Sequence, residues 1–254
     1  MTLDPLTLAI ALVALVGASI QAVTGFGFGL VTMGLLPLLL PVEQAVPMVG
    51  AWGWTLNLLI LWRLRAHLEL RRVLPMVAGG VLGIPVGLAF LKGVDEAVVK
   101  GTLGLVLVGY GLLALGGGVK PRAQAISDRW GLLAGLLGGA LGGAFNTSGP
   151  PVVIYVSLKG WDKDVATSAL QAFFSFSSTF SLIGFWWAGL FTPTVVHTLL
   201  PLYPVVWLGS LVGARIYDRV PQERFRVAVL VLLVVLGASF LWSVGVAWRA
   251  MLRS

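Results

Sequence analysis

Two short stretches place glycines and small polar residues inside apolar sequence: GFGFG at Gly25–Gly29, the first break, and NTSGP at Asn146–Pro150, the second break. Proline suits the first turn of a helix, so a helix is expected to begin near Pro150. Asn, Thr and Ser are the residue types that cap such a start. A helix N-terminus offers unpaired backbone N–H groups and a positive dipole end, which together bind anions. Both breaks are therefore predicted to bind a small anion without a buried Lys or Arg.

Further residues extend this candidate site. The missing side chains at Gly25, Gly27 and Gly29 let a ligand approach the backbone. Polar side chains at membrane depth face protein or a cavity, although a hydrogen bond between helices is an equally valid role for each of them. The candidate substrate-binding residues are Gln21, Thr24, Gly25, Phe26, Gly27, Gly29, Asn57, Asn146, Thr147, Ser148, Gly149, Pro150, Gln171, Ser175 and Ser178. No catalytic or metal-binding residue is predicted.

Each break also has a purely structural explanation. GFGFG is typical of close packing between membrane helices, where small residues are common. NTSGPP would also kink a helix, and its first three residues match a glycosylation sequon, although their position in an apolar run argues against glycosylation. The binding interpretation is favoured because the two breaks occupy equivalent positions of an internal repeat.

The repeat is visible in two stretches of similar sequence. LPMVAGGVLGIPVG (Leu74–Gly87) matches LPLYPVVWLGSLVG (Leu200–Gly213) with an offset of 126 residues. Upstream, an offset of 121 residues places the first break on the second. The sequence thus predicts two homologous halves of one integral membrane domain, residues 1–119 and 130–254, joined by a charged linker at 120–129.

The elements that carry the breaks must be membrane helices, because the chain is 58% hydrophobic and only 11% charged, whereas soluble domains carry about a quarter charged residues. About 20 apolar residues span a bilayer. The predicted segments are 6–23, 27–41, 44–62, 73–91 and 98–118, then 130–145, 149–159, 165–187, 195–214 and 225–247. Those beside the breaks are short enough to enter the membrane and return. The expected fold is an all-α polytopic membrane protein with two inverted repeats of about five helical segments each, and broken or re-entrant half-helices at equivalent positions.

Charge predicts the orientation of these segments. Loop 63–72 carries four arginines, whereas its repeat counterpart, 188–194, carries no charged residue. Lys and Arg gather in cytoplasmic loops. Residues 63–72, the linker and 215–226 are therefore predicted to be cytoplasmic, and 92–97 and 188–194 to lie outside.

Several functions are disfavoured by composition. The chain has no cysteine, which excludes disulfides, thiolate metal sites and a thiol nucleophile. The net charge of +7 is explained by cytoplasmic loops rather than by nucleic acid. No cofactor is predicted. Coupling to H⁺ or Na⁺ is left open, as is the oligomeric state, a homodimer included.

The order of the motifs resembles the sulfite exporter TauE/SafE family. The motifs are GFGFG, then AVPMVGAWGWTLN, GGVLGIPVG and, in the second half, GGAFNTSGPPVVIYVSLKGWDK followed by ATSALQAFF. The resemblance covers about residues 10–245 and implies a carrier of small, often sulfur-containing anions such as sulfite, sulfoacetate and other organosulfonates. It implies a prokaryotic protein, located in the cytoplasmic (inner) membrane. It also implies that Gly25–Gly29 and Gly149–Pro151 are the family's glycine-rich segment and its proline-containing counterpart.

Three function classes are compatible with these observations. Interrupted helices in corresponding positions of two halves favour a secondary transporter that works by alternating access. An anion channel is the alternative. Saturable and coupled flux would indicate a carrier rather than a channel. A membrane enzyme or assembly factor is disfavoured, because the sequence lacks a metal-binding His pair on a helix and a buried carboxylate dyad.

Overall fold

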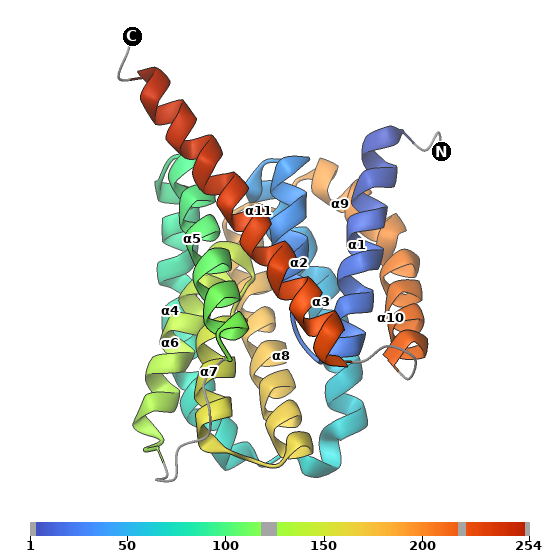
Figure 1. Ribbon diagram of the computed structural model, residues 1–254, viewed down its shortest axis with the longest axis vertical. Helices are drawn as coiled ribbons and strands as arrows, with labels where there is room; N and C mark the ends of the chain where they lie inside the picture. Colours follow the sequence, from blue (N-terminus) through green and yellow to red (C-terminus); the bar gives the residue numbers. More distant parts are fainter. Residues whose placement is uncertain (1–3, 118–125, 218–221, 252–254) are drawn as a thin grey trace.

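A computed structural model describes residues 4–117, 126–217 and 222–251, without the side chains of 216–217, 222–226 and 247–251. All regular structure in these residues is helical (Figure 1). The helices are α1 (Pro5–Thr24), α2 (Phe28–Leu35), η1 (Leu36–Leu38), α3 (Val42–Leu64), η2 (Arg65–His67), α4 (Leu70–Gly93), α5 (Glu96–Leu115), α6 (Arg129–Phe145), α7 (Gly149–Lys159), α8 (Lys163–Trp187), α9 (Pro193–Leu199), η3 (Leu200–Leu202), α10 (Tyr203–Tyr217) and α11 (Gln222–Met251).

Six helical segments among the described residues are long and apolar enough to cross a membrane, which confirms an all-α polytopic membrane protein. They are Pro5–Thr24, Val42–His67, Leu70–Gly93, Glu96–Leu115, Pro193–Arg215 and Val227–Val246. The 25-residue helix α8 is not among them, although it is long enough, because its buried serines lower its hydropathy. The predicted segments beside the breaks correspond to α1, α2 with η1, α6 and α7.

The first of these segments is longer than the sequence suggested. Helix α1 has 20 residues, about 30 Å at 1.5 Å per residue, and by length it can cross the bilayer. It starts early because Asp4 caps it, accepting a hydrogen bond from the Thr7 N–H at 2.6 Å. This hydrogen bond also lowers the pKa of the Asp4 carboxyl group.

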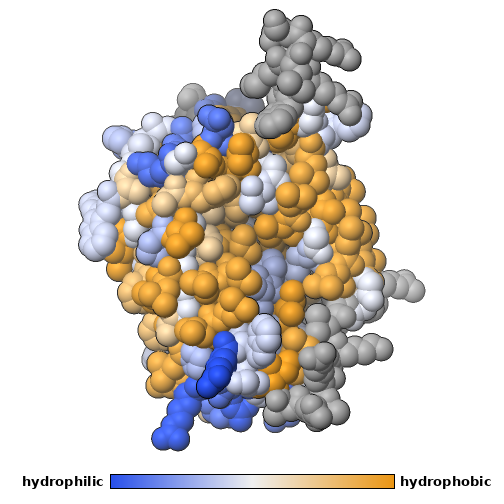
Figure 2. Space-filling model, turned by 90° about the vertical axis from the view of Figure 1, so that its left-hand side faces the viewer, coloured by the Kyte–Doolittle hydropathy of each residue, from blue (hydrophilic) through white to orange (hydrophobic). Residues whose placement is uncertain are grey.

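The outer surface between the two ends of the molecule is apolar. Figure 2 shows hydrophobic residues across the middle and hydrophilic residues toward both ends. Large apolar side chains on α4, α5 and α6 remain exposed, among them Leu82, Leu105 and Leu137. A surface of this kind is stable when lipid covers it.

The helices pack in pairs that combine the two sequence halves: α1 with α10, α4 with α6, α3 with α8, and α5 with α11. Exchanging the halves maps this set of pairs onto itself. Glycines at repeat-equivalent positions make the first two contacts. A Cβ atom added to Gly83 would lie within 3.0 Å of the Leu136 carbonyl oxygen, and one added to Gly209 would lie within 3.0 Å of the Leu15 carbonyl oxygen. These contacts follow the offsets of 126 and 121 residues, while the inverted orientation and the division into halves stay predictions.

Two opposite ends of the bundle differ in charge. The basic face, residues 63–72, 126–129 and 159–164, is held together by Ser168 Oγ donating to the His67 carbonyl (3.0 Å) and by Lys159 Nζ bonding Asp128 (2.6 Å). At the opposite face, residues 41–43, 92–96 and 188–194, Lys92 Nζ donates to the Ala188 carbonyl (2.7 Å). The predicted linker lies outside the described residues at 120–125, as does part of loop 215–226.

Candidate functional site

The two breaks end their preceding helices in the same way. Gly25 closes α1 in the left-handed conformation with φ 80°, and Asn146 closes α6 with φ 51°. The offset of 121 residues makes these two positions equivalent. Asn146 is the one non-glycine residue with positive φ in the described chain. Asn tolerates this conformation better than most residues, and unlike Gly25 it contributes a polar side chain.

Helix α2 begins within the first break, and its first turn has three unpaired backbone N–H donors. Val31 N–H bonds the carbonyl of Gly27 at 3.0 Å, so the N–H groups of Phe28, Gly29 and Leu30 have no acceptor within the helix. Gly27 precedes this turn with φ 103°, a conformation that favours glycine. The α2 N-terminus is therefore the stronger of the two donor sites.

Helix α7 offers fewer donors than expected from the sequence. Pro150 and Pro151 have no N–H, and the N–H groups of Asn146 and Thr147 bond Gly142 and Leu141 carbonyls. This leaves the N–H groups of Ser148 and Gly149. The expected cap is also absent, because Ser148 occupies the N-cap position without a side-chain cap bond. Its Oγ lies 3.4 Å from Ser177 Oγ instead.

The breaks touch one another. A Cβ atom added to Gly29 would lie within 3.0 Å of the Asn146 carbonyl oxygen. The Asn146 side chain lies over helix α3, where its Oδ1 would be 3.6 Å from a Cβ on Gly50 and its Nδ2 3.7 Å from a Cβ on Gly53. Glycines on α2 and α3 thus leave the space that lets the second break pack closely against the first.

A small cavity of about 50 Å³ lies between the breaks. Its lining is Gln21, Phe26, Gly27, Phe28, Gly29, Leu30, Gly53, Asn57, Asn146, Thr147, Ser148, Gly149, Phe174 and Ser178. Thr147 is fully buried, and its Oγ1 has no hydrogen-bond partner. Since buried polar groups are nearly always hydrogen-bonded, this hydroxyl is available to a ligand in the cavity.

Two of the lining residues are joined to one another, because Gln21 Nε2 donates to Asn57 Oδ1 at 2.8 Å. The candidate residues outside the lining are Thr24, Gly25, Pro150, Gln171 and Ser175. Gln171 Nε2 donates to the carbonyl of Gly25. Gln171 and Ser175 are buried on α8, each with an oxygen that lacks a partner. Pro150 is buried in the first turn of α7. The structure therefore brings most of the predicted residues together at this cavity. Gln171 and Pro150 lie outside its lining and hold the surrounding backbone in place.

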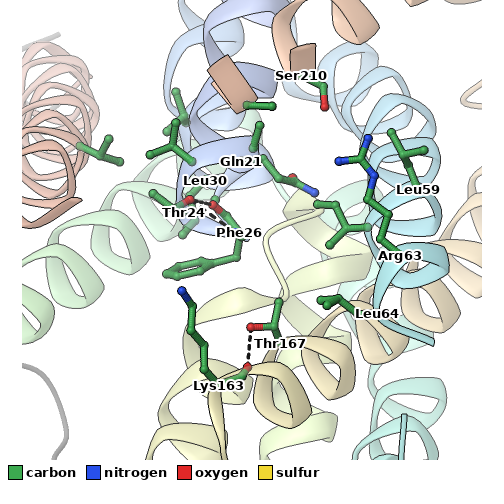
Figure 3. A pocket seen from close by; sticks show the side chains of 18 of the residues that line it. Gln21, Thr24, Phe26, Leu30, Leu59, Arg63, Leu64, Lys163, Thr167 and Ser210 are labelled. Atoms are coloured by element: carbon green, nitrogen blue, oxygen red, sulfur yellow. Dashed lines mark hydrogen bonds between the residues drawn. The ribbon is translucent and has the colours of Figure 1, made fainter. Parts of the chain in front are cut away.

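A large cavity of about 590 Å³ adjoins the small one (Figure 3). Four residues line both: Gln21, Phe26, Gly27 and Leu30. Thr24 and Gly25 line the large cavity only, with largely apolar residues of α3, α10 and α11. Arg63 and Lys163, both exposed, line it at the basic face. In Figure 3, Arg63 and Gln21 point toward one another across the cavity.

Sequence reasoning missed part of both linings. The small cavity is also lined by Phe28, Leu30, Gly53 and Phe174, which were not predicted. Arg63, Lys163 and Tyr110 are among the residues overlooked in the large cavity. A cavity is not predicted by a glycine in an apolar helix, nor by a charged residue at a helix end. Repeat position offers a signal for one of them, because Phe174 lies 121 residues after Gly53.

Comparison with known proteins agrees with this architecture. The family model described as "Sulfite exporter TauE/SafE" matches residues 9–240. The chain is also 28% identical over 242 residues to "Probable sulfite/organosulfonate exporter TauE" of Cupriavidus necator, an alignment that covers 92% of this chain and 94% of that protein. No solved structure matches.

Proposed function

The chain belongs to the sulfite exporter TauE/SafE family, and we propose that it is a secondary transporter that carries a small sulfur-containing anion across the cytoplasmic membrane by alternating access. Sulfite, sulfoacetate and other organosulfonates are the proposed substrates. The observation that carries this proposal is the small cavity between two helix breaks, with unpaired backbone donors on one side and the partnerless Thr147 hydroxyl on the other.

Recognition by these groups does not require a fixed cation. The N–H groups of Phe28, Gly29 and Leu30 converge at the positive end of α2, and those of Ser148 and Gly149 at α7. A hydrogen bond to a charged group contributes about 1.5–3 kcal/mol. A few such bonds offset the cost of removing a small anion from water. Neutral donors also let the anion leave more easily than a buried ion pair would, as a carrier requires.

A difference between repeat-equivalent positions supports alternating access. Thr24 and Leu64 line the large cavity toward the basic face, whereas their equivalents in the second half, Phe145 and Phe185, are 1% and 0% exposed. The Phe145 ring packs edge-on against Phe90, 6.1 Å between centroids. The molecule is thus hollow toward the basic face and sealed at the corresponding place on the other side. A carrier whose two halves exchange these arrangements would expose the site alternately.

Transport by purified protein in liposomes tests the proposal. Labelled sulfite and sulfoacetate should enter vesicles at a rate that saturates with concentration, and unlabelled substrate on the far side should accelerate the exchange. Imposed H⁺ and Na⁺ gradients then show whether either ion is coupled. A flux that rises linearly with concentration and shows no exchange would favour the channel, and an absence of flux for every anion would overturn the proposal.

A further inference from the structure

Phe26 occupies the boundary between the two cavities. It is one of four residues that line both, and among these it is the one with an aromatic side chain. Its ring contacts both hydrophobic clusters of the protein. In Figure 3 it extends from the first break, below Thr24 and next to Lys163. Phe26 therefore lies at the place where the cavity that reaches the basic face meets the space between the breaks.

The backbone on both sides of Phe26 is glycine in a left-handed conformation. Gly25 has φ 80° and Gly27 has φ 103°, so the residue between them is held in place by few local restraints. Contacts with neighbouring residues position it instead. The Thr24 hydroxyl donates to the Phe26 carbonyl, and the ring lies edge-on to Tyr110 with 6.4 Å between centroids. Aromatic pairs of this geometry add only a modest attraction beyond the burial of their surface, so the ring is able to move away from Tyr110.

We infer that Phe26 is the specificity-determining gate of the transporter: its ring limits the inner site to the anionic group of the substrate and closes that site from the large cavity. This inference rests on the proposed function. The small cavity, about 50 Å³, has room for a group of only a few non-hydrogen atoms. The large cavity is more than tenfold larger, at about 590 Å³, and mostly apolar. Sulfite fits inside the closed gate, whereas an organosulfonate with a longer body holds the gate open.

Cysteine accessibility tests the gate without any transport. The chain has no cysteine, so Ser178→Cys reports on the small cavity and Ser210→Cys on the large one. With Phe26 present, a sulfonate-bearing methanethiosulfonate reagent should label Ser178→Cys about tenfold more slowly than Ser210→Cys, because packed side chains exclude it. Adding Phe26→Ala should remove most of that difference and leave Ser210→Cys unchanged.

Matched variants keep the test decisive. Phe176→Ala removes a ring that is 44% exposed on α8 and should alter neither labelling rate. If Phe26→Ala does not fold, Phe26→Leu, which keeps the apolar contact but shortens the barrier, should give an intermediate rate. Equal labelling of the two cysteines with Phe26 present would overturn the gate, as would an unchanged Ser178→Cys rate in both Phe26 variants.

Transport selectivity provides the second measurement. Phe26→Ala should shift the preference, measured as the ratio of half-saturation concentrations, about tenfold from sulfite toward hexanesulfonate. An unchanged ratio would contradict the role in specificity. A wild-type protein that moves no anion but shows the predicted labelling pattern would overturn the proposed function and retain the gate. Normal sulfite transport with equal labelling of the two cysteines would retain the proposed function and overturn the gate.

Discussion

The carbonyl oxygen of Asn146 lies against the backbone of Gly29, so close that a Cβ atom on Gly29 would come within 3.0 Å of it. Asn146 ends α6 and Gly29 lies in the first turn of α2. This contact joins the two breaks, and the cavity beside it is the proposed anion site.

Gly29→Ala should therefore disrupt the site. The added methyl group would meet a backbone carbonyl, which cannot move as a side chain can, and overpacking of this kind costs about 1–3 kcal/mol. We expect a lower melting temperature in detergent and loss of sulfite transport. Gly109→Ala is the matched control, because a Cβ there meets nothing within 4 Å and alanine favours a helix. Equal behaviour of the two variants would show that the breaks are not in close contact.

Thr147→Val should weaken anion binding without unfolding the protein. The change keeps the branched shape of the side chain and removes a buried hydroxyl that has no protein partner. Losing one hydrogen bond to an anion should raise the dissociation constant about tenfold to a hundredfold, measured by equilibrium binding of labelled sulfite. Thr102→Val is the control, because its hydroxyl bonds the carbonyl of Val98 within α5. A normal dissociation constant for Thr147→Val would remove this hydroxyl from the site.

Phe145→Ala should open the sealed side of the transporter. Phe145 is 1% exposed and packs against Phe90, so its truncation leaves a gap at the place equivalent to the large cavity. We expect Ser178→Cys to become reactive toward an impermeant reagent added from the outside of whole cells. The change should also produce a sulfite leak that does not saturate. Protection from outside as complete as in the single Ser178→Cys protein would mean that another element forms the seal.

The basic face should lie in the cytoplasm. Arg65 and Thr194 lie at opposite faces of the bundle and are both exposed. Arginine-rich loops stay in the cytoplasm, so Thr194→Cys should react with an impermeant reagent outside intact cells, and Arg65→Cys only after the cells are opened. Labelling of both from outside would contradict this orientation.

Helix positions and the two breaks were predictable because both leave local signals. Apolar tract length gives the helices, and the glycines and prolines that interrupt the tracts mark the breaks. The proximity of Gln21 to Asn57, and of Asn146 to Gly29, depends instead on how the helices pack. Helix packing is not marked by a local sequence pattern, so these two contacts could not be predicted. The large cavity was also unpredictable. Arg63 and Lys163 come from helix ends 100 residues apart, and each alone reads as an ordinary charge at a membrane surface.

The donor chemistry of α7 shows a different limit. The sequence indicates a helix that starts with prolines, and it does so in the structure. The same prolines remove two of the donors that a helix N-terminus normally offers. Most of the backbone donors therefore come from α2, where Gly27 precedes Phe28 and Gly29, and the contribution of the second break depends on Thr147 and Ser148.

The position of a bound anion tests the central claim most directly. Selenite has the shape and charge of sulfite and scatters anomalously, so crystals soaked in selenite would locate it without reference to activity. The proposed mechanism predicts a selenium peak in the small cavity, within hydrogen-bond distance of the α2 N-terminus and of Thr147 Oγ1. A peak only at Arg63 and Lys163, at the mouth of the large cavity, would show that fixed cations bind the anion and would contradict recognition by the helix breaks.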